Sequence, residues 1–301
     1  MDCKDSIILV GSNGFIQRKL ENYFKFTHKT HSLSYDLLST YCEESDLRRK
    51  LLGSDIIVTP ICYSVSDSMV NEGETFRNEV FPLVYLLNYL RLNKFKNRVL
   101  MIGSGEEYGQ DANKSTAKEL TSPLNMYSLA KMCESHFFQL FIRSFGLDGI
   151  ILRTFNEIGP EQDSRFVVQQ IIQQGIEISL KGESKIFRVG NPYVKRNFTD
   201  VRDVITAVDL VLKFGKTGKV YDVASEKSYS IKEIIELVSD ILKISPMLEV
   251  DPYKLRSNDP VNLCPNIKNI QIDTGWVREY SIQETLKDII SYKIKKESLQ
   301  K

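Results

Sequence analysis

The chain has 301 residues, of which 42% are hydrophobic and 26% are charged, and its formal net charge is +1. This composition is that of an ordinary globular protein, and it contains no basic block for nucleic acid and no apolar run that could span a membrane. The five cysteines are scattered without metal-site spacing, so we expect reduced thiols in a cytoplasmic protein that has no metal site and no signal peptide.

The chain opens with a short apolar run, residues 6–10, which predicts a buried parallel strand because glycine follows it at once. The next residues, Gly11 to Gln17, form a glycine loop that leads into a helix. Glycines allow a tight turn, and the backbone amides at the start of a helix bind phosphate. The spacing predicts a dinucleotide-binding loop. Gln17 replaces the third glycine of the usual pattern, so we expect a slightly displaced helix or cofactor.

Residues 31–35 are predicted to form the second strand, and Asp36 ends it. An acidic side chain about 25 residues after the first glycine is placed to bind the ribose 2′-hydroxyl of NAD, and an ordinary turn aspartate fits the sequence equally well. Arg18, Arg48 and Arg49 could instead bind a 2′-phosphate. The sequence therefore leaves both NADH and NADPH open as the cofactor.

Strands and helices alternate through the rest of the first half. Strands are predicted at residues 55–58 and 98–102, with a helix at 76–92 between them. This alternation is typical of βαβ units and predicts an α/β fold, a Rossmann-type doubly wound parallel sheet. Ser104 follows the strand at 98–102, at the edge where such sheets bind ligands, so it is either a catalytic hydroxyl or a turn serine.

Tyr127 and Lys131 lie four residues apart in a predicted helix that ends at Gly146, and this spacing places them on one face. An ammonium group beside a phenol favours the phenolate and lowers the phenol pKa from its reference value of about 10. Tyr127 is thus a candidate acid or base, and an ordinary surface pair is the alternative. The helix is also rich in aromatic residues, which indicates a subunit interface.

The alternation becomes weaker in the second half of the chain. We therefore expect a first domain of residues 1–155, to which part of 200–225 returns, and a smaller α/β substrate domain at 156–301. Arg196 and Arg256 lie in this second region, and paired guanidinium groups suit a pyrophosphate. Two ordinary surface arginines are the alternative.

Six motifs, in order along the chain, resemble those of a known family. They are Gly11-x-x-Gly14-Phe15-Ile16, Ser104–Gly109, Tyr127-x-x-x-Lys131, Arg153–Pro160, Arg196–Asp203 and Arg256–Asp259. With these motifs, the chain resembles the extended short-chain dehydrogenase/reductase family that acts on nucleotide sugars, and the resemblance covers nearly the whole chain. Two stretches depart from the family pattern. Gln17 replaces a glycine, and residues 59–62, Thr-Pro-Ile-Cys, replace a His-Leu-Ala-Ala-like stretch beside the cofactor.

The resemblance implies a role for each matched residue. The implied catalytic residues are Ser104, Tyr127 and Lys131, together with Glu106 at the position of the dehydratase base. The implied cofactor-binding residues are Gly11, Asn13, Gly14, Phe15, Ile16, Asp36, Asp46, Tyr127 and Lys131. The implied residues for the diphosphate and ribose of the substrate are Asn156, Arg196, Arg256 and Asp259. Members of the family usually form dimers through a four-helix bundle, and the candidate helices here are 76–92 and 127–145.

The resemblance also implies a reaction, the NAD(P)H-dependent reduction of a nucleotide-linked 4-keto-6-deoxy sugar for surface polysaccharide, with a GDP-sugar favoured. Tyr127 would donate a proton to the developing alkoxide, and Ser104 would hydrogen-bond the carbonyl oxygen. One alternative is a 4-epimerase or C4 oxidoreductase that retains its NAD. Another is a 4,6-dehydratase, although Gly105 cannot transfer the proton that a side chain at this position provides in many dehydratases. A non-catalytic nucleotide-sensing protein with the same fold is a further alternative.

Overall fold

The computed structural model describes residues 6–34, 45–59, 72–109, 123–181, 186–255 and 265–299. The chain divides into two compact units, and each combines segments that are distant in sequence. The first unit comprises residues 1–155, 204–223 and 265–277, and the second comprises residues 156–203, 224–264 and 278–301. The sequence did not indicate that residues 265–277 belong to the first unit.

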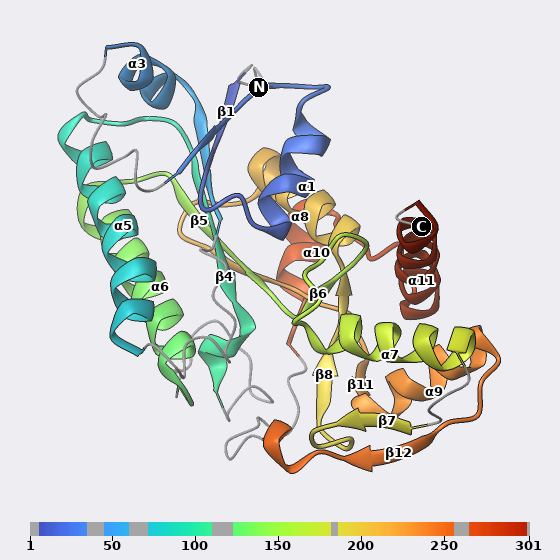
Figure 1. The fold of residues 1–301 in the computed structure, drawn as a ribbon. Helices are drawn as coiled ribbons and strands as arrows, with labels where there is room; N and C mark the ends of the chain where they lie inside the picture. Colours follow the sequence, from blue (N-terminus) through green and yellow to red (C-terminus); the bar gives the residue numbers. More distant parts are fainter. Residues whose placement is uncertain are drawn as a thin grey trace. The chain divides into compact units, whose positions relative to one another are not determined.

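A six-stranded sheet forms the centre of the first unit (Figure 1). Its strand order is β10-β5-β4-β3-β1-β2, and all neighbouring strands are parallel. The strands are β1 (Ser6–Val10), β2 (Lys29–Leu33), β3 (Asp55–Val58), β4 (Val99–Ser104), β5 (Gly149–Thr154) and β10 (Val220–Val223). This arrangement confirms the predicted Rossmann-type fold. The second strand begins and ends two residues earlier than predicted.

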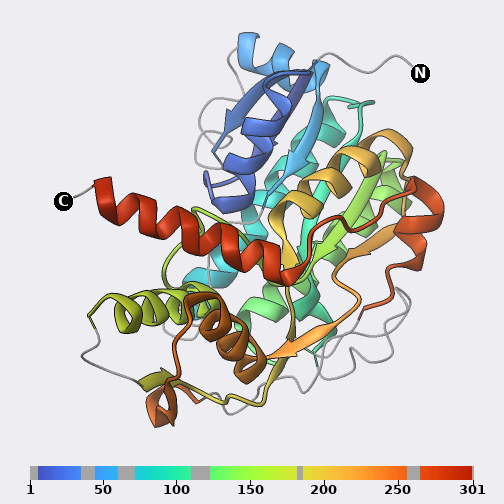
Figure 2. The ribbon, with the colours of Figure 1, turned by 90° about the vertical axis from the view of Figure 1, so that its right-hand side faces the viewer.

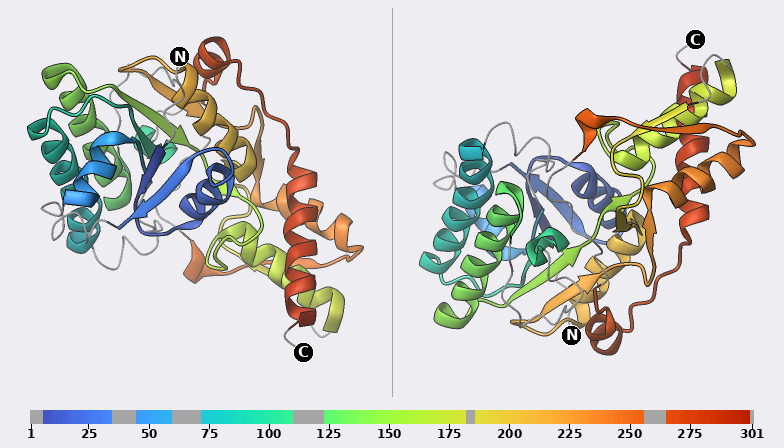
Figure 3. Two further views of the ribbon diagram at one scale, coloured as in Figure 1. Left: turned by 90° about the horizontal axis from the view of Figure 1, so that it is seen from above. Right: turned by 90° about the horizontal axis from the view of Figure 1, so that it is seen from below.

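Helices cover both faces of this sheet, as Figure 3 shows from two sides. They are α1 (Phe15–Phe24), α3 (Ser45–Gly53), α5 (Glu72–Leu92), α6 (Met126–Phe145), α8 (Val201–Phe214) and α10 (Lys268–Thr274). The central strands β1, β3, β4 and β5 are mostly apolar and almost fully buried, as expected for a parallel sheet between two helix layers. Helices α5 and α6 pack side by side on one of these faces.

The second unit contains three helices around a separate apolar core, α7 (Val167–Lys181), α9 (Ile231–Leu242) and α11 (Ile282–Leu299). Figure 2 shows α11 packed against α7 and α9. Three short strand pairs flank them: β6 (Glu157–Ile158) with β9 (Thr199–Asp200), β7 (Ile186–Val189) with β12 (Met247–Val250), and β8 (Lys195–Asn197) with β11 (Ser228–Ser230). Across the described ranges of both units, no helix is long and apolar enough to cross a membrane.

Candidate active site

Three strands of the first unit end beside the residues that the sequence identified. Strand β1 ends before the glycine loop, β3 ends before Thr59, and β4 ends at Ser104. Because the strands are parallel, these ends lie along one edge of the sheet. The strand order also reverses next to β1, and ligands of doubly wound sheets bind at such a reversal.

The glycine loop is closely packed against the sheet. A Cβ atom on Gly11 would lie 1.9 Å from the Thr59 Oγ1 atom, so only glycine fits there. Gly14 precedes the first turn of α1, and no side chain caps the amides of that turn. A tight glycine turn that leads into an uncapped helix N-terminus fits the pyrophosphate of a dinucleotide.

The two departures from the family pattern contact each other. Gln17 is buried, and its Oε1 atom accepts hydrogen bonds from the Asn13 amide (2.9 Å) and the Thr59 hydroxyl (3.0 Å). The guanidinium of Arg18 donates to the Asn13 carbonyl at 2.6 Å, and Asn13 itself has a positive φ of 61°. The Gln17 side chain therefore occupies the space below the loop and holds Asn13 in its left-handed conformation.

We expect Gln17→Ala to weaken NADPH binding by roughly 2- to 10-fold, since one net hydrogen bond of about 0.5–1.5 kcal/mol would no longer hold the loop. A fluorescence titration with NADPH measures this dissociation constant. Gln283→Ala is the matched control, because Gln283 is exposed on α11 of the other unit. Tighter binding by Gln17→Ala would show instead that Gln17 competes with the phosphate for the Asn13 amide.

Ser104, the last residue of β4, is held by the short 3-10 helix η1 (Gly105–Tyr108) that follows it. Its Oγ atom accepts a hydrogen bond from the Glu106 amide at 3.2 Å. Its own amide donates to Glu107 Oε1 at 3.0 Å. The hydroxyl oxygen thus receives a backbone donor, which leaves the hydroxyl proton available for a carbonyl oxygen.

Behind Ser104 lies a buried ionic cluster of Glu107, Arg153 and Asp222. Arg153 Nη2 lies 2.9 Å from Glu107 Oε2, and the Tyr108 hydroxyl is 2.9 Å from both Asp222 oxygens. The Arg153 guanidinium also stacks over the Tyr108 ring at 4.7 Å. Burial, partly offset by Arg153, raises the pKa of Asp222 to about 7. Burial opposes the charge of Arg153, but the neighbouring carboxylates outweigh it and hold the Arg153 pKa above its ordinary value.

We expect the raised pKa of Asp222 to make the wild type less stable as the pH rises. The folded protein keeps this proton up to about pH 7, whereas an unfolded aspartate releases it near its ordinary value of 3.8. This stabilisation is therefore complete below about pH 4 and is lost as the pH rises to 7, with a total of about 4 kcal/mol. In melting experiments from pH 5 to 8, the Tm of wild type should fall relative to that of Asp222→Asn. Parallel curves would contradict this assignment.

Tyr127 lies in the first turn of α6, and a capping box fixes the start of this helix. Asn125 Oδ1 accepts the Ser128 amide at 2.9 Å, and the Asn125 amide donates back to Ser128 Oγ at 3.0 Å. One turn later, the Lys131 Nζ atom lies 5.7 Å from the centroid of the Tyr127 ring. The predicted pair therefore does share one helix face.

The ammonium of Lys131 is also bonded to two buried carboxyl groups that the sequence analysis did not identify. Nζ donates to Glu79 Oε2 on α5, and to both oxygens of Glu134 on α6 at 3.2 and 3.3 Å. Lys131 is only 1% exposed. Burial opposes its charge, but Glu134 and Glu79 outweigh burial and hold the Lys131 pKa well above its ordinary value.

In the second unit, the structure brings together two of the predicted substrate residues. Asn156 Nδ2 donates to the Asn197 carbonyl at 3.2 Å, and Arg196 precedes Asn197 in strand β8. Asn156 has a φ of 34°, a strained value for a residue other than glycine. Asp36, Arg256 and Asp259 lie outside the described residues, as does the side chain of Asp46. Arg48 and Arg49 lie exposed on α3 of the first unit.

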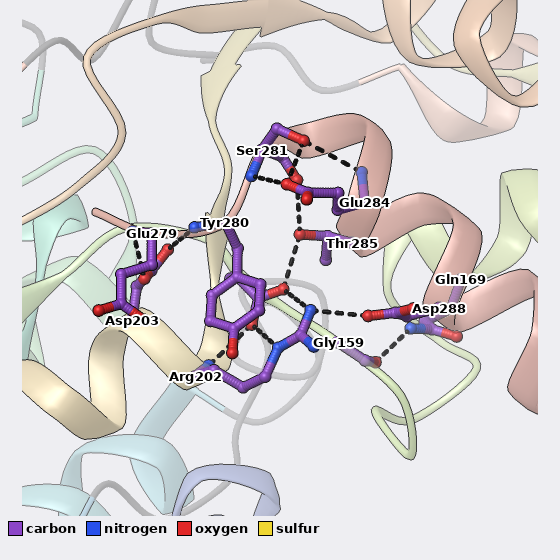
Figure 4. A network of polar contacts seen from close by, with 11 residues as sticks. Gly159, Gln169, Arg202, Asp203, Glu279, Tyr280, Ser281, Glu284, Thr285 and Asp288 are labelled. Carbon is purple, nitrogen blue, oxygen red and sulfur yellow. Dashed lines mark hydrogen bonds and ion pairs between the residues drawn. The ribbon is translucent and has the colours of Figure 1, made fainter.

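The end of the Arg196–Asp203 motif has a structural role (Figure 4). Arg202 pairs with Asp200 at 2.7 Å and with Asp288 at 2.8 Å, and its guanidinium stacks over the Tyr280 ring at 3.6 Å. Asp203 accepts the amides of the residues at positions 279 and 280. These contacts, all within the second unit, join residues 200–203 to the segment before α11 and to Asp288 in that helix.

Comparison with known proteins identifies the family. The sequence model of the GDP-mannose 4,6 dehydratase family matches residues 62–289, which is most of the chain. The chain belongs to this family. The match also confirms the resemblance to the extended short-chain dehydrogenase/reductases.

The proteins that this chain is similar to are named for several different reactions. A GDP-6-deoxy-D-mannose reductase from Pseudomonas aeruginosa is 27% identical over 293 residues, which cover 95% of this chain and 96% of that one. A UDP-glucose 4-epimerase from Halalkalibacterium halodurans is 22% identical and aligns over 76% of this chain and 74% of that one. The solved structure of RMD from Pseudomonas aeruginosa, complexed with NADPH, has a TM-score of 0.82 and 25% identity, and the match covers 95% of this chain and 98% of that one.

The family is named after a dehydratase, but the surroundings of Gly105 in this chain bear on whether it can catalyse a dehydration. A Cβ atom on Gly105 would lie 2.2 Å from the Phe155 ring, which itself stacks against Tyr108 with centroids 6.2 Å apart. No side chain fits at position 105. The additional proton donor that a dehydration requires therefore cannot be placed there.

Proposed function

We propose that this protein reduces the keto group of a nucleotide-linked 4-keto-6-deoxy sugar with NADPH or NADH, and that the nucleotide is GDP. The observation that carries the proposal is the packing of the Phe155 ring against Gly105, the residue after Ser104. The chain also has the Ser104, Tyr127 and Lys131 that a carbonyl reduction of this type requires. This packing disfavours dehydration, because no proton donor fits at position 105, but it does not affect the residues that a carbonyl reduction needs. The similarity to a GDP-6-deoxy-D-mannose reductase over 95% of the chain supports the same choice.

The proposed mechanism assigns one task to each side chain. Ser104 donates a hydrogen bond to the keto oxygen, and η1 orients its hydroxyl through the Glu106 amide. Tyr127 donates its phenol proton to the same oxygen as the alkoxide develops. Lys131 acts on Tyr127, because its buried ammonium lies 5.7 Å from the centroid of the Tyr127 ring. When the cofactor is bound, its nicotinamide would supply the hydride, and the loop at Gly11 and Gly14 would hold the cofactor pyrophosphate.

The first experiment is to follow the nicotinamide absorbance with GDP-4-keto-6-deoxymannose, with NADPH and NADH tested separately. The proposal expects loss of reduced cofactor together with an equal amount of GDP-deoxysugar. A 4-epimerase would show no net loss, and it would release bound NAD on denaturation. Cofactor binding without turnover of any nucleotide sugar would favour the non-catalytic alternative.

We also propose a homodimer formed through α5 and α6. Both helices carry large apolar side chains that remain exposed in the single chain, and these are Phe81, Tyr85, Phe137 and Leu140. Such a stripe on two adjacent helices suits a four-helix bundle. By light scattering, the wild type should have the mass of a dimer, and Phe137→Glu/Leu140→Glu should have that of a monomer. Tyr253→Glu, which introduces the same charge at a more exposed aromatic residue of the other unit, should remain dimeric.

A further inference from the structure

The cluster around Lys131 contains more carboxyl groups than its charge requires. Lys131, Glu79 and Glu134 are 1%, 2% and 5% exposed, so three ionisable groups share a site that is almost free of water. Within the described residues, the Oε1 atom of Glu79 is buried and has no hydrogen-bond partner. A buried carboxylate oxygen without a donor is costly, whereas a protonated carboxyl group can be accommodated more easily.

The charge balance also indicates that one carboxyl group of the cluster is protonated. One ammonium and two carboxylates would leave a net negative charge inside the first unit, and an uncompensated buried charge is strongly destabilising. Two adjacent carboxyl groups in such a site hold a proton between them. Burial, reinforced by the neighbouring Glu79, raises the pKa of Glu134 well above its ordinary value, while Lys131 acts in the opposite direction.

We propose that the Glu134 carboxyl group keeps its proton, so that Glu79, Glu134 and Lys131 form an electrically neutral cluster, and that this cluster keeps Tyr127 in its phenol form. Both glutamates are positioning residues, because they act on Tyr127 only through Lys131. The inference rests on the proposed function, in which Tyr127 must carry a proton to act as the acid.

The reason is the field that Tyr127 experiences. A lone ammonium beside the ring would favour the phenolate, which suits a base and thus an oxidation. An ammonium that is paired with a carboxylate has almost no net charge, and the phenol then keeps its proton at neutral pH. The carboxyl pair therefore favours reduction over the oxidation with which a retained-NAD enzyme begins.

Two ionisable groups that lie close to this cluster or contact α6 leave the balance unchanged. Cys133 lies beside Glu134, and burial together with that carboxyl raises its thiol pKa, so it stays neutral. From η1, Glu107 reaches α6 through the Ser135 hydroxyl at 2.7 Å, but its charge is paired with Arg153 of β5. Strand β4, which also packs against α6, carries no ionisable side chain.

The proton on Glu134 can be observed directly by infrared spectroscopy of the substrate-free protein. The parent should be Asp222→Asn, which removes a buried carboxyl group whose pKa is raised to about 7. The buried Asp203, with a pKa of about 6, is ionised at the pH of the measurement. At about pH 8, this parent should show the carbonyl stretch of a protonated carboxyl group. Glu79→Gln and Glu134→Gln should each lose the band, because the remaining carboxylate then pairs with Lys131. Absence of the band in the parent, or its survival in either variant, would overturn the proposal.

A second measurement tests the effect on Tyr127. The tyrosinate absorbance of each protein is followed as the pH is raised. The same titration of that protein carrying Tyr127→Phe is subtracted, so that the difference reports Tyr127. In each single glutamine variant, the pH midpoint of Tyr127 ionisation should lie within about half a unit of the parent midpoint, since the cluster remains neutral. In the double variant, this midpoint should lie about 1–3 units lower. An unmoved midpoint in the double variant would overturn the role of the pair. Neither assay needs substrate, so a negative result in either one can be distinguished from a failure of the proposed reductase function.

Discussion

Tyr127→Phe is expected to lower kcat for the keto sugar by roughly 100- to 10,000-fold, the usual contribution of a positioned general acid. The substitution removes only the hydroxyl group. The ring and its contact with Lys131 remain, so the structure of α6 should be preserved. The dissociation constant for NADPH should therefore change by no more than about threefold, because less than 1 kcal/mol of cofactor binding depends on this hydroxyl.

The measurement combines steady-state turnover with a fluorescence titration of NADPH. Tyr253→Phe is the matched control, since Tyr253 is almost fully exposed in the other unit and should retain wild-type turnover. A Tyr127→Phe enzyme with more than about a tenth of wild-type kcat would remove Tyr127 from the role of proton donor. The search for the acid would then turn to Glu106, which adjoins Ser104 in η1.

The sequence predicted the first unit well, because its signals are local. The apolar run at β1, the glycine turn and the alternation of strands and helices each span only a few residues, and the parallel fold follows from them. Ser104 could be placed at the sheet edge for the same reason. The Tyr127 and Lys131 pair follows from helix spacing alone.

The partners of these residues could not be predicted, because they are distant in sequence. Glu79 lies 52 positions before Lys131, and Thr59 lies 42 positions after Gln17. The Gln17 and Thr59 departures appeared to be independent changes, and only the folded chain shows that they bond to each other. A signal for Glu79 was present, since an acidic residue interrupts an otherwise apolar helix face. A single sequence does not reveal which cation it meets.

Arg153→Met should be the most destabilising of the substitutions considered, with a loss of about 3–5 kcal/mol. Glu107 is fully buried, and Arg153 is the cation that compensates it. Without Arg153, the donors that Glu107 would retain among the described residues are neutral, the Ser135 hydroxyl and the Ser104 amide. For a chain of this size, we expect Tm to fall by roughly 10 °C. Because Ser104 depends on Glu107, turnover should also decrease in the protein that remains folded.

Two further variants separate the buried charge from the loss of packing. Arg188→Met removes an exposed arginine that lies 3.5 Å from Glu249, and such a pair contributes less than about 1 kcal/mol, so its Tm should barely change. Arg153→Met/Glu107→Gln removes the cation and its main partner together. It should recover much of the lost stability, because no unpaired Glu107 carboxylate remains. If the double variant melted as low as Arg153→Met, the loss would come from the guanidinium packing over Tyr108 rather than from the charge, and the ionic cluster behind Ser104 would be a minor element of the fold.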